Sequence, residues 1–224
     1  MRVSLSFLVF LIAATGLASC SKTNDDIAVP RRVTTIAVIN AGPDTLNVFQ
    51  RGTRLNSGSN LLPGGQYTNL QVSVGTSNYQ FKKVGSPDNL IEMPFTIDTS
   101  TVYTMFVAGR TPDKVFLLRD SLPLPDTAAN TARIRFVNAS PLDGTLDVSV
   151  GSTFNYKNVA FKSATPFIQV SSGKIALAIR QAGDTIAKGT LTLTNHYTYT
   201  LFTKGVLKGT GTGLFGARIL ITRQ

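Results

Sequence analysis

Ile36-Ala-Val-Ile-Asn40-Ala41-Gly-Pro43 is the most informative segment of the chain, because a close copy of it occurs later in the sequence. It returns 98 residues further on as Ile134-Arg-Phe-Val-Asn138-Ala139-Ser-Pro141. Four further matches follow in the same order: residues 45–48 with 145–148, 71–73 with 169–171, 95–97 with 191–193, and 103–106 with 199–202. Matches in one order with small drifts in spacing indicate a tandem duplication.

The repeated segments define the domain organisation. We expect repeat 1 over residues 33–119 and repeat 2 over residues 132–224, joined by a linker at 120–131 that Pro123 and Pro125 stiffen. Each repeat has about 90 residues, which is small for a domain with its own core. We therefore expect some contact between the repeats.

Both repeats read as strands rather than helices. Leu191 and Leu193 alternate with Thr192 and Thr194, and turn-forming runs such as Pro63-Gly64-Gly65 interrupt the apolar segments at short intervals. We find no convincing amphipathic helix after the first twenty residues. The sequence predicts an all-β chain of two tandem antiparallel β-sandwich domains with about seven short strands each, immunoglobulin-like or transthyretin-like in architecture.

The first twenty residues resemble an export signal. Arg2 precedes a short apolar run, which ends in Leu17-Ala18-Ser19-Cys20 and resembles the lipobox of bacterial lipoproteins. We expect a signal peptide over residues 1–19 and lipidation, palmitate included, of Cys20, the only cysteine. An ordinary secretory signal is the alternative. Residues 20–32 then form a tether to the membrane.

The residue after the lipobox bears on localisation. Ser21 follows Cys20, whereas an Asp there marks inner-membrane retention in some Gram-negative lipoproteins. We therefore expect the cell outer membrane, with the periplasmic and surface-exposed faces both open. The acidic pair Asp25-Asp26 in the tether is a weak match to a surface-export signal.

Repeat 2 also carries a family pattern. It reads Arg135-Phe-Val-Asn138-Ala139-Ser140-Pro141, then Leu146-Asp-Val-Ser-Val150, and later Tyr199-Thr-Leu-Phe202. This pattern resembles a family of bacterial secreted domains known as domain of unknown function 4397, whose members often read RFVHASP at the first of these places. The resemblance implies an extracytoplasmic β-sandwich without an established activity. Asn138 stands where many members have His, so a role for that His does not carry over.

Composition narrows the chemistry. The chain has one His, His196, and Glu92 is its only glutamate. One His and one Cys cannot build a multi-ligand zinc site or an internal disulfide, and we expect no cofactor and no metal. No nucleophile elbow or marked carboxylate pair is present. We predict that the protein is not an enzyme; the alternative, a hydrolase, requires a cleft that gathers Glu92 or His196 with several Asp residues.

Several short motifs favour turns over ligand sites. Asp143 and Asp147 flank a tight turn but lack the ligand spacing of a calcium loop, so we expect an Asx-type turn. Asn40 and Asn138 are each expected to fix a turn. The glycine-rich run at 205–216 lacks the Gly-Lys-Ser/Thr ending of a phosphate loop, and we expect a flexible hairpin loop there.

That loop is nevertheless the best candidate for binding, because insertions on a rigid scaffold commonly carry function. It is longer than its counterpart at 109–113 in repeat 1. The residues expected to bind a ligand are Lys204, Lys208, Thr210 and Thr212.

The chain carries 22 Lys+Arg against 12 Asp+Glu, without a nucleic-acid motif. In an envelope, an anionic glycan or other envelope polymer is the more plausible partner, although the charge can also be incidental.

Three functional hypotheses follow. The first is a non-enzymatic binding or adhesion module held by a lipid anchor, in which two linked modules gain effective concentration toward a repeated ligand. The second is a structural or accessory subunit of an envelope complex with a protein partner. The third is the hydrolase described above.

Overall fold

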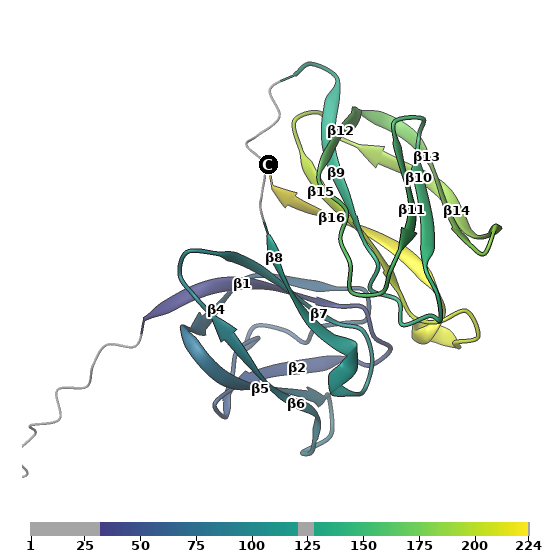
Figure 1. Ribbon diagram of the computed structural model, residues 1–224. Coiled ribbons are helices and arrows are strands. Elements are labelled where there is room, and N and C mark those ends of the chain that lie inside the picture. The colour runs from purple at the N-terminus through teal and green to yellow at the C-terminus, as the bar shows by residue number, and fades with distance from the viewer. Residues whose placement is uncertain (1–31, 121–127, 224) are drawn as a thin grey trace, which may run out of the picture. The chain divides into compact units, whose positions relative to one another are not determined.

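The computed structural model describes residues 32–120 and 128–223, and over these residues the chain is all-β, as the sequence predicts (Figure 1). The only helical segments among them are two single 3-10 turns, η1 (Pro112–Lys114) and η2 (Gly211–Gly213). None of the helices in this part of the chain is long and apolar enough to cross a membrane. Residues 1–19 and Cys20, and with them the predicted signal and anchor, lie outside the described residues.

Repeat 1 supplies eight strands, one more than expected. They are β1 (Val33–Asn40), β2 (Leu46–Gln50), β3 (Thr53–Arg54), β4 (Gln66–Ser73), β5 (Gly75–Lys83), β6 (Asn89–Ile97), β7 (Val102–Val107) and β8 (Val115–Asp120). They form two four-stranded sheets in the orders β4-β1-β7-β8 and β3-β2-β5-β6. The shortest of them is the two-residue β3, which is too short to leave a periodic pattern in the sequence.

Repeat 2 has the same topology. Its strands are β9 (Thr131–Val137), β10 (Leu146–Val150), β11 (Phe154–Val159), β12 (Ile168–Ser171), β13 (Gly173–Gln181), β14 (Asp184–Leu193), β15 (Thr198–Lys204) and β16 (Gly216–Arg223). The sheet orders are β12-β9-β15-β16 and β11-β10-β13-β14, which are the orders of repeat 1 with every number raised by eight. In both repeats the first and seventh strands pair in parallel, so the expectation of wholly antiparallel sandwiches is corrected: one sheet of each repeat is mixed.

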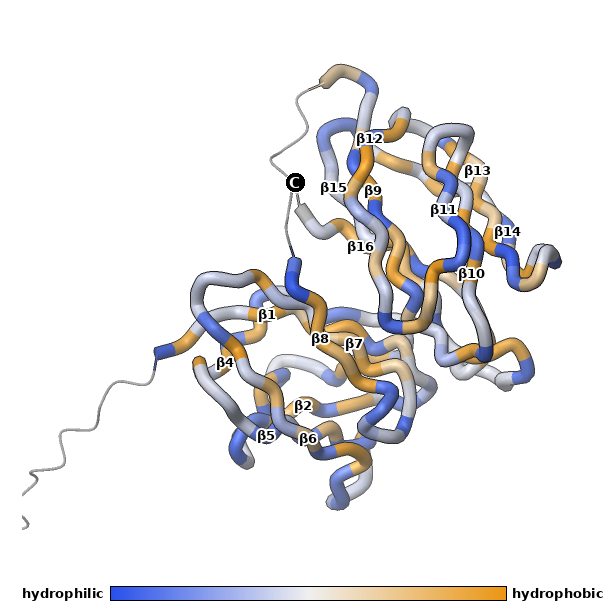
Figure 2. Tube along the Cα trace, viewed as in Figure 1, coloured by the Kyte–Doolittle hydropathy of each residue, from blue (hydrophilic) through white to orange (hydrophobic). Residues whose placement is uncertain are grey.

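Each pair of sheets encloses one hydrophobic core. The core of repeat 1 joins Val38 and Met105 of one sheet to Val48 and Phe81 of the other, all fully buried. The alternation along β5 produces this arrangement, because its inward residues Tyr79 and Phe81 are buried while Gln80 between them is partly exposed. Figure 2 shows the hydrophobic residues that run along β7 and β8.

A third apolar cluster contains residues of both repeats. Its fully buried aromatic members are Phe106 of β7 and Phe202 of β15, whose ring centroids lie 6.0 Å apart with the planes at 66°. Ile39 and Ala41 of repeat 1 and Val137 of repeat 2 belong to the same cluster. The expected contact between the small repeats is therefore an apolar interface.

A buried ion pair lies between β8 and β9. Arg135 Nη1 donates to Asp120 Oδ1 over 2.6 Å, and the two side chains are 5% and 1% exposed. Asp120 also accepts from the Thr104 hydroxyl, and Arg135 Nε donates to Thr200. Asp120, which the sequence places at the start of the linker, is thus the last residue of β8 and is tied to repeat 2.

Candidate functional site

Loop 205–216 joins β15 to β16 and is folded back on itself. Val206 N donates to Gly213 O over 2.9 Å, Gly209 N donates to Val206 O over 2.9 Å, and Gly213 N donates to Thr210 O over 3.0 Å. Lys204 Nζ donates to the carbonyl oxygens of Thr212 and Leu214. The segment is a hairpin connection between the antiparallel strands β15 and β16, as expected, and these bonds give it a compact form.

The glycines make this compaction possible. Gly205 has φ +67°, and a Cβ there would clash with the carbonyl oxygen of Gly213. A Cβ on Gly209 would meet the same oxygen. The glycine richness therefore serves close packing of the backbone, which is a general use of this residue.

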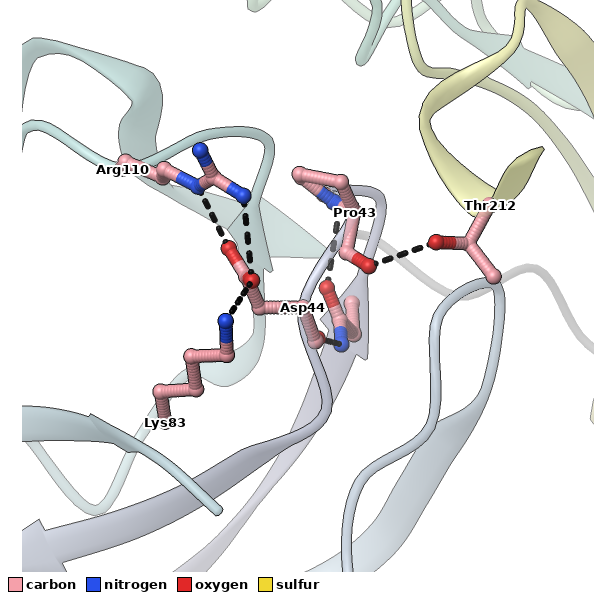
Figure 3. Close-up of polar contacts among 7 residues, drawn as sticks. Pro43, Asp44, Lys83, Arg110 and Thr212 are labelled. Carbon is pink, nitrogen blue, oxygen red and sulfur yellow. Dashed lines mark hydrogen bonds and ion pairs between the residues drawn. The ribbon is translucent and has the colours of Figure 1, made fainter. Parts of the chain in front are cut away.

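The folded loop contacts repeat 1. Gly205 N donates to Ala41 O over 3.1 Å, and the Thr212 hydroxyl donates to Pro43 O over 2.8 Å (Figure 3). The Ser140 hydroxyl donates to Gly205 O. The duplicated segments around Asn40 and Asn138 thus both support the loop.

A cleft of about 590 Å³ lies where these segments meet. Repeat 1 lines it with Pro43, Asp44, Ala108, Gly109, Arg110, Thr111 and Lys114, and repeat 2 lines it with Pro141, Gly205, Val206, Gly209, Thr210, Thr212 and Gly213. The lining is mostly small apolar side chains and backbone, with hydroxyl and charged groups added. A volume of this size suits a ligand site.

Asp44 organises the charged side of the cleft. Its side chain is 7% exposed and accepts from Arg110 Nε over 2.6 Å and from Arg110 Nη2 over 3.1 Å (Figure 3). Lys83 Nζ lies 3.3 Å from Asp44 Oδ1. The hydrogen bonds from Arg110 lower the pKa of the Asp44 carboxyl, and burial opposes them. One buried carboxylate therefore holds two exposed cations.

Of the four residues predicted to bind a ligand, Thr210 and Thr212 line this cleft. Lys204 and Lys208 are not among its lining residues in the described part of the chain. Lys204 instead holds the loop through its hydrogen bonds. The pKa of its ammonium group is lowered, mainly by burial and to a smaller extent by the positive charge of the neighbouring Arg218.

Sequence reasoning missed the charged residues that repeat 1 supplies. Arg110 and Lys114 lie in the short β7–β8 connection, which we considered only as the counterpart of the longer loop. Lys114 Nζ lies 2.9 Å from Asp113 and 5.5 Å from the ring centroid of Phe161 in repeat 2. The repeat alignment could have pointed to these residues, because equivalent connections of two repeats lie at equivalent ends of their sandwiches.

The two duplicated asparagines fix turns, as predicted. Asn40 Oδ1 accepts from Gly42 N over 3.0 Å, and its Nδ2 donates to Asp44 O and Leu61 O. Asn138 Oδ1 accepts from Ser140 N over 3.2 Å, and its Nδ2 donates to Val159 O. Both side chains are buried.

The remaining chemical candidates lie elsewhere. Glu92 of β6 accepts from Asn78, Gln80 and Asn89 on an exposed sheet surface. His196 occupies the turn before β15 with φ +68°. The Asp147 carboxylate accepts from Asn158 N over 2.8 Å. Within residues 32–120 and 128–223, no group of three His, Cys, Asp or Glu side chains is placed to hold a metal ion.

Comparison with known proteins agrees with the duplication. No curated protein matches the chain. The family model described as Domain of unknown function (DUF4397) matches twice, over residues 34–149 and 132–215. The two matches together span most of the sequence; the first covers repeat 1 and runs on into β10, and the second covers repeat 2 from β9 to β15, so that they overlap over residues 132–149. The chain therefore belongs to the DUF4397 family and carries the domain in tandem.

Proposed function

We propose that this chain is a non-enzymatic lipoprotein of the outer membrane that binds an anionic glycan or a similar envelope polymer. The observation that carries the proposal is the cleft itself. It is formed by both repeats, the loop singled out in the sequence forms one wall, and Arg110 and Lys114 supply positive charge at the other. An anionic polymer complements this charge.

The direction of the strands supports a role in display. The tether at residues 20–32 leads into β1 at Val33, whereas the turn that lines the cleft follows Asn40 at the other end of this eight-residue strand. Eight residues of strand extend over about 26 Å. The cleft thus lies at the end of repeat 1 away from the point where the tether enters.

For each repeat we further propose the transthyretin-like rather than the immunoglobulin-like arrangement. Immunoglobulin domains place their first and second strands in one sheet. Here β1 and β2 belong to different sheets, as do β9 and β10. Of the two arrangements expected from the sequence, this order favours the transthyretin-like one.

Binding is tested on the mature full-length protein with polygalacturonate as the anionic polymer and amylose as its neutral control. We expect binding to polygalacturonate that weakens as salt is raised, because surface charges are screened. The Thr210→Ala/Thr212→Ala variant, which alters two hydroxyl groups of the cleft, should bind more weakly than Thr190→Ala in the exposed part of β14. Equal binding of both polymers would contradict the proposal.

The anchor is tested separately by fractionation of cells that express the Cys20→Ala variant. Loss of the thiol removes the lipid attachment point, so the protein should move from the membrane fraction to the soluble fraction. Cys20→Ala protein that remained in the outer membrane would show that another feature holds it there.

A second candidate function is an accessory subunit of an envelope protein complex. Two leucines of loop 205–216 favour it, since Leu207 and Leu214 are 42% and 49% exposed. Exposed apolar side chains of this size suit a protein interface. Cross-linking in native membranes should then yield one dominant cross-linked protein partner. The Leu207→Ser/Leu214→Ser variant should no longer form this cross-linked product.

A further inference from the structure

We infer that the chain carries one composite anion site rather than one site in each repeat, with Arg110 as the residue that contacts the anionic group and Asp44 as its positioning residue. This inference rests on the proposed function and assigns the ligand contact within it. The ligand class is a glycan that bears carboxylate or phosphate groups.

The first observation is that Asp44 holds the side chain of Arg110 in place. Its side chain is 60% exposed, yet two of its nitrogens are held by the Asp44 carboxylate, which is itself 7% exposed. A guanidinium has five N–H donors, so this pair leaves donors for an oxyanion. A side chain already held in place loses less conformational freedom on binding.

The second step is charge. Lys83 also contacts Asp44, so the single buried carboxylate is matched by two cations. Lys114 lies on the same side of the cleft, and its partner is Asp113. The group formed by Arg110, Lys83 and Asp44 therefore retains a net positive charge, which suits carboxylate or phosphate recognition.

The third step is the opposite wall. Repeat 2 contributes Pro141, Val206 and the hydroxyl-bearing Thr210, and its glycine backbone borders the same space. Apolar surface beside hydroxyl groups matches a sugar ring, which presents both C–H and O–H groups. The charged group and the ring would thus be bound by different repeats.

The fourth step is that repeat 2 has no equivalent pair. With the shift of 96 residues that relates Tyr103 to Tyr199, Arg110 corresponds to Val206. With the shift of 100 that relates Thr45 to Thr145, Asp44 corresponds to Gly144. The duplicated fold therefore presents the Asp–Arg pair once.

The test is calorimetric titration of the mature full-length protein with three short probes. These are an oligogalacturonate, a phosphate-bearing mannan oligosaccharide and a neutral malto-oligosaccharide. We expect one bound acidic oligosaccharide per chain and no binding of the neutral one. The acidic probe that binds more tightly identifies the anionic group.

Arg110→Gln should weaken acidic binding by about tenfold or more, since a hydrogen bond to a charged group is lost. Arg110→Lys should restore part of the affinity through its charge. The control Lys188→Gln removes an exposed cation on β14 of repeat 2 and should leave affinity unchanged at about 0.15 M salt, where distant surface charges are screened.

A double-mutant cycle tests the positioning role. Asp44→Asn should weaken binding in the native background and have little further effect beside Arg110→Gln, because Asp44 acts through Arg110. Additive effects of the two variants would overturn that role. Two bound oligosaccharides per chain, or unchanged affinity in Arg110→Gln, would overturn the composite site while leaving polymer binding intact. Absence of acidic binding in the native protein would overturn both.

Discussion

Repeat 1 and repeat 2 share every strand pairing but differ at the loops that form the cleft. Both use a buried asparagine to fix the turn after the first strand. The connection after the seventh strand is short and charged in repeat 1, with Arg110 and Lys114, and long and glycine-rich in repeat 2. The duplication has thus kept the residues that build the fold, and Pro43 and Pro141 of the duplicated segments both line the cleft, while the charged groups and the long loop of the cleft differ between the repeats.

A second difference concerns the tyrosine of the seventh strand. The Tyr103 hydroxyl donates to the Asp98 carboxylate over 2.7 Å, and this bond lowers the pKa of Asp98 to about 2. The equivalent Tyr199 hydroxyl instead accepts from Thr194 N over 2.8 Å. The hydroxyl groups of equivalent tyrosines therefore hydrogen-bond to a carboxylate in one repeat and to a backbone N–H in the other.

The largest expected effect would break the contact between the repeats. Phe202→Ala removes a fully buried ring that packs against Phe106, so we expect a loss of about 4 kcal/mol in the free energy of unfolding. Urea denaturation measures the loss, and hydrogen exchange should show weaker protection in both β7 and β15. Weaker protection in β15 alone would show that the repeats are stabilised independently.

The next effect concerns the buried ion pair. Arg135→Ala leaves the Asp120 carboxylate buried without its cation, at a cost of about 3 kcal/mol in unfolding free energy. Replacing both partners, as Arg135→Met with Asp120→Asn, should cost less because no uncompensated charge remains. If the double variant were less stable than Arg135→Ala, the pair would have a role beyond mutual neutralisation.

A smaller effect compares the two asparagines directly. Asn40→Ala and Asn138→Ala each leave buried backbone groups without partners, and we expect about 2 kcal/mol for each in urea denaturation. Only Asn40 contacts the backbone of Asp44, so Asn40→Ala should also weaken oligogalacturonate binding more than Asn138→Ala does. Equal losses of affinity would mean that both turns shape the cleft.

The smallest expected effect is a loss of stability at low pH, caused by two carboxylates of repeat 1. The pKa of Asp44, lowered by Arg110, and that of Asp98, lowered by Tyr103, both lie below their ordinary value of 3.8. Such groups stabilise the fold above the unfolded pKa, and their contribution disappears as pH falls through the folded pKa. The urea midpoint should therefore fall between about pH 4 and 2.

The control for the acid effect is Asp98→Asn, which retains an acceptor for Tyr103 but cannot titrate. Its urea midpoint should depend less steeply on pH over the same interval. A variant as acid-sensitive as the native protein would assign the titration to other carboxylates.

Much of the fold was predictable because it depends on short-range patterns. Alternation along β13 and β14, the turn residues between strands and the asparagine turns are all readable from neighbouring residues. Each repeat has eight strands rather than about seven, and of these the two-residue β3 is too short to carry a periodicity. In the candidate site, the loop at 205–216 was predictable from composition, whereas Arg110 and Asp44 were not, since they come together over 66 residues of sequence.

The duplication, the all-β class and the residues that fix equivalent turns can be read from the sequence alone, because each leaves a local or repeated pattern. The packing of the repeats through Phe106 and Phe202, the pair of Asp120 with Arg135 and the closure of the glycine-rich loop against Pro43 emerge only in three dimensions. These contacts join residues distant in sequence. They depend on how the two sandwiches pack, which no local pattern in the sequence specifies.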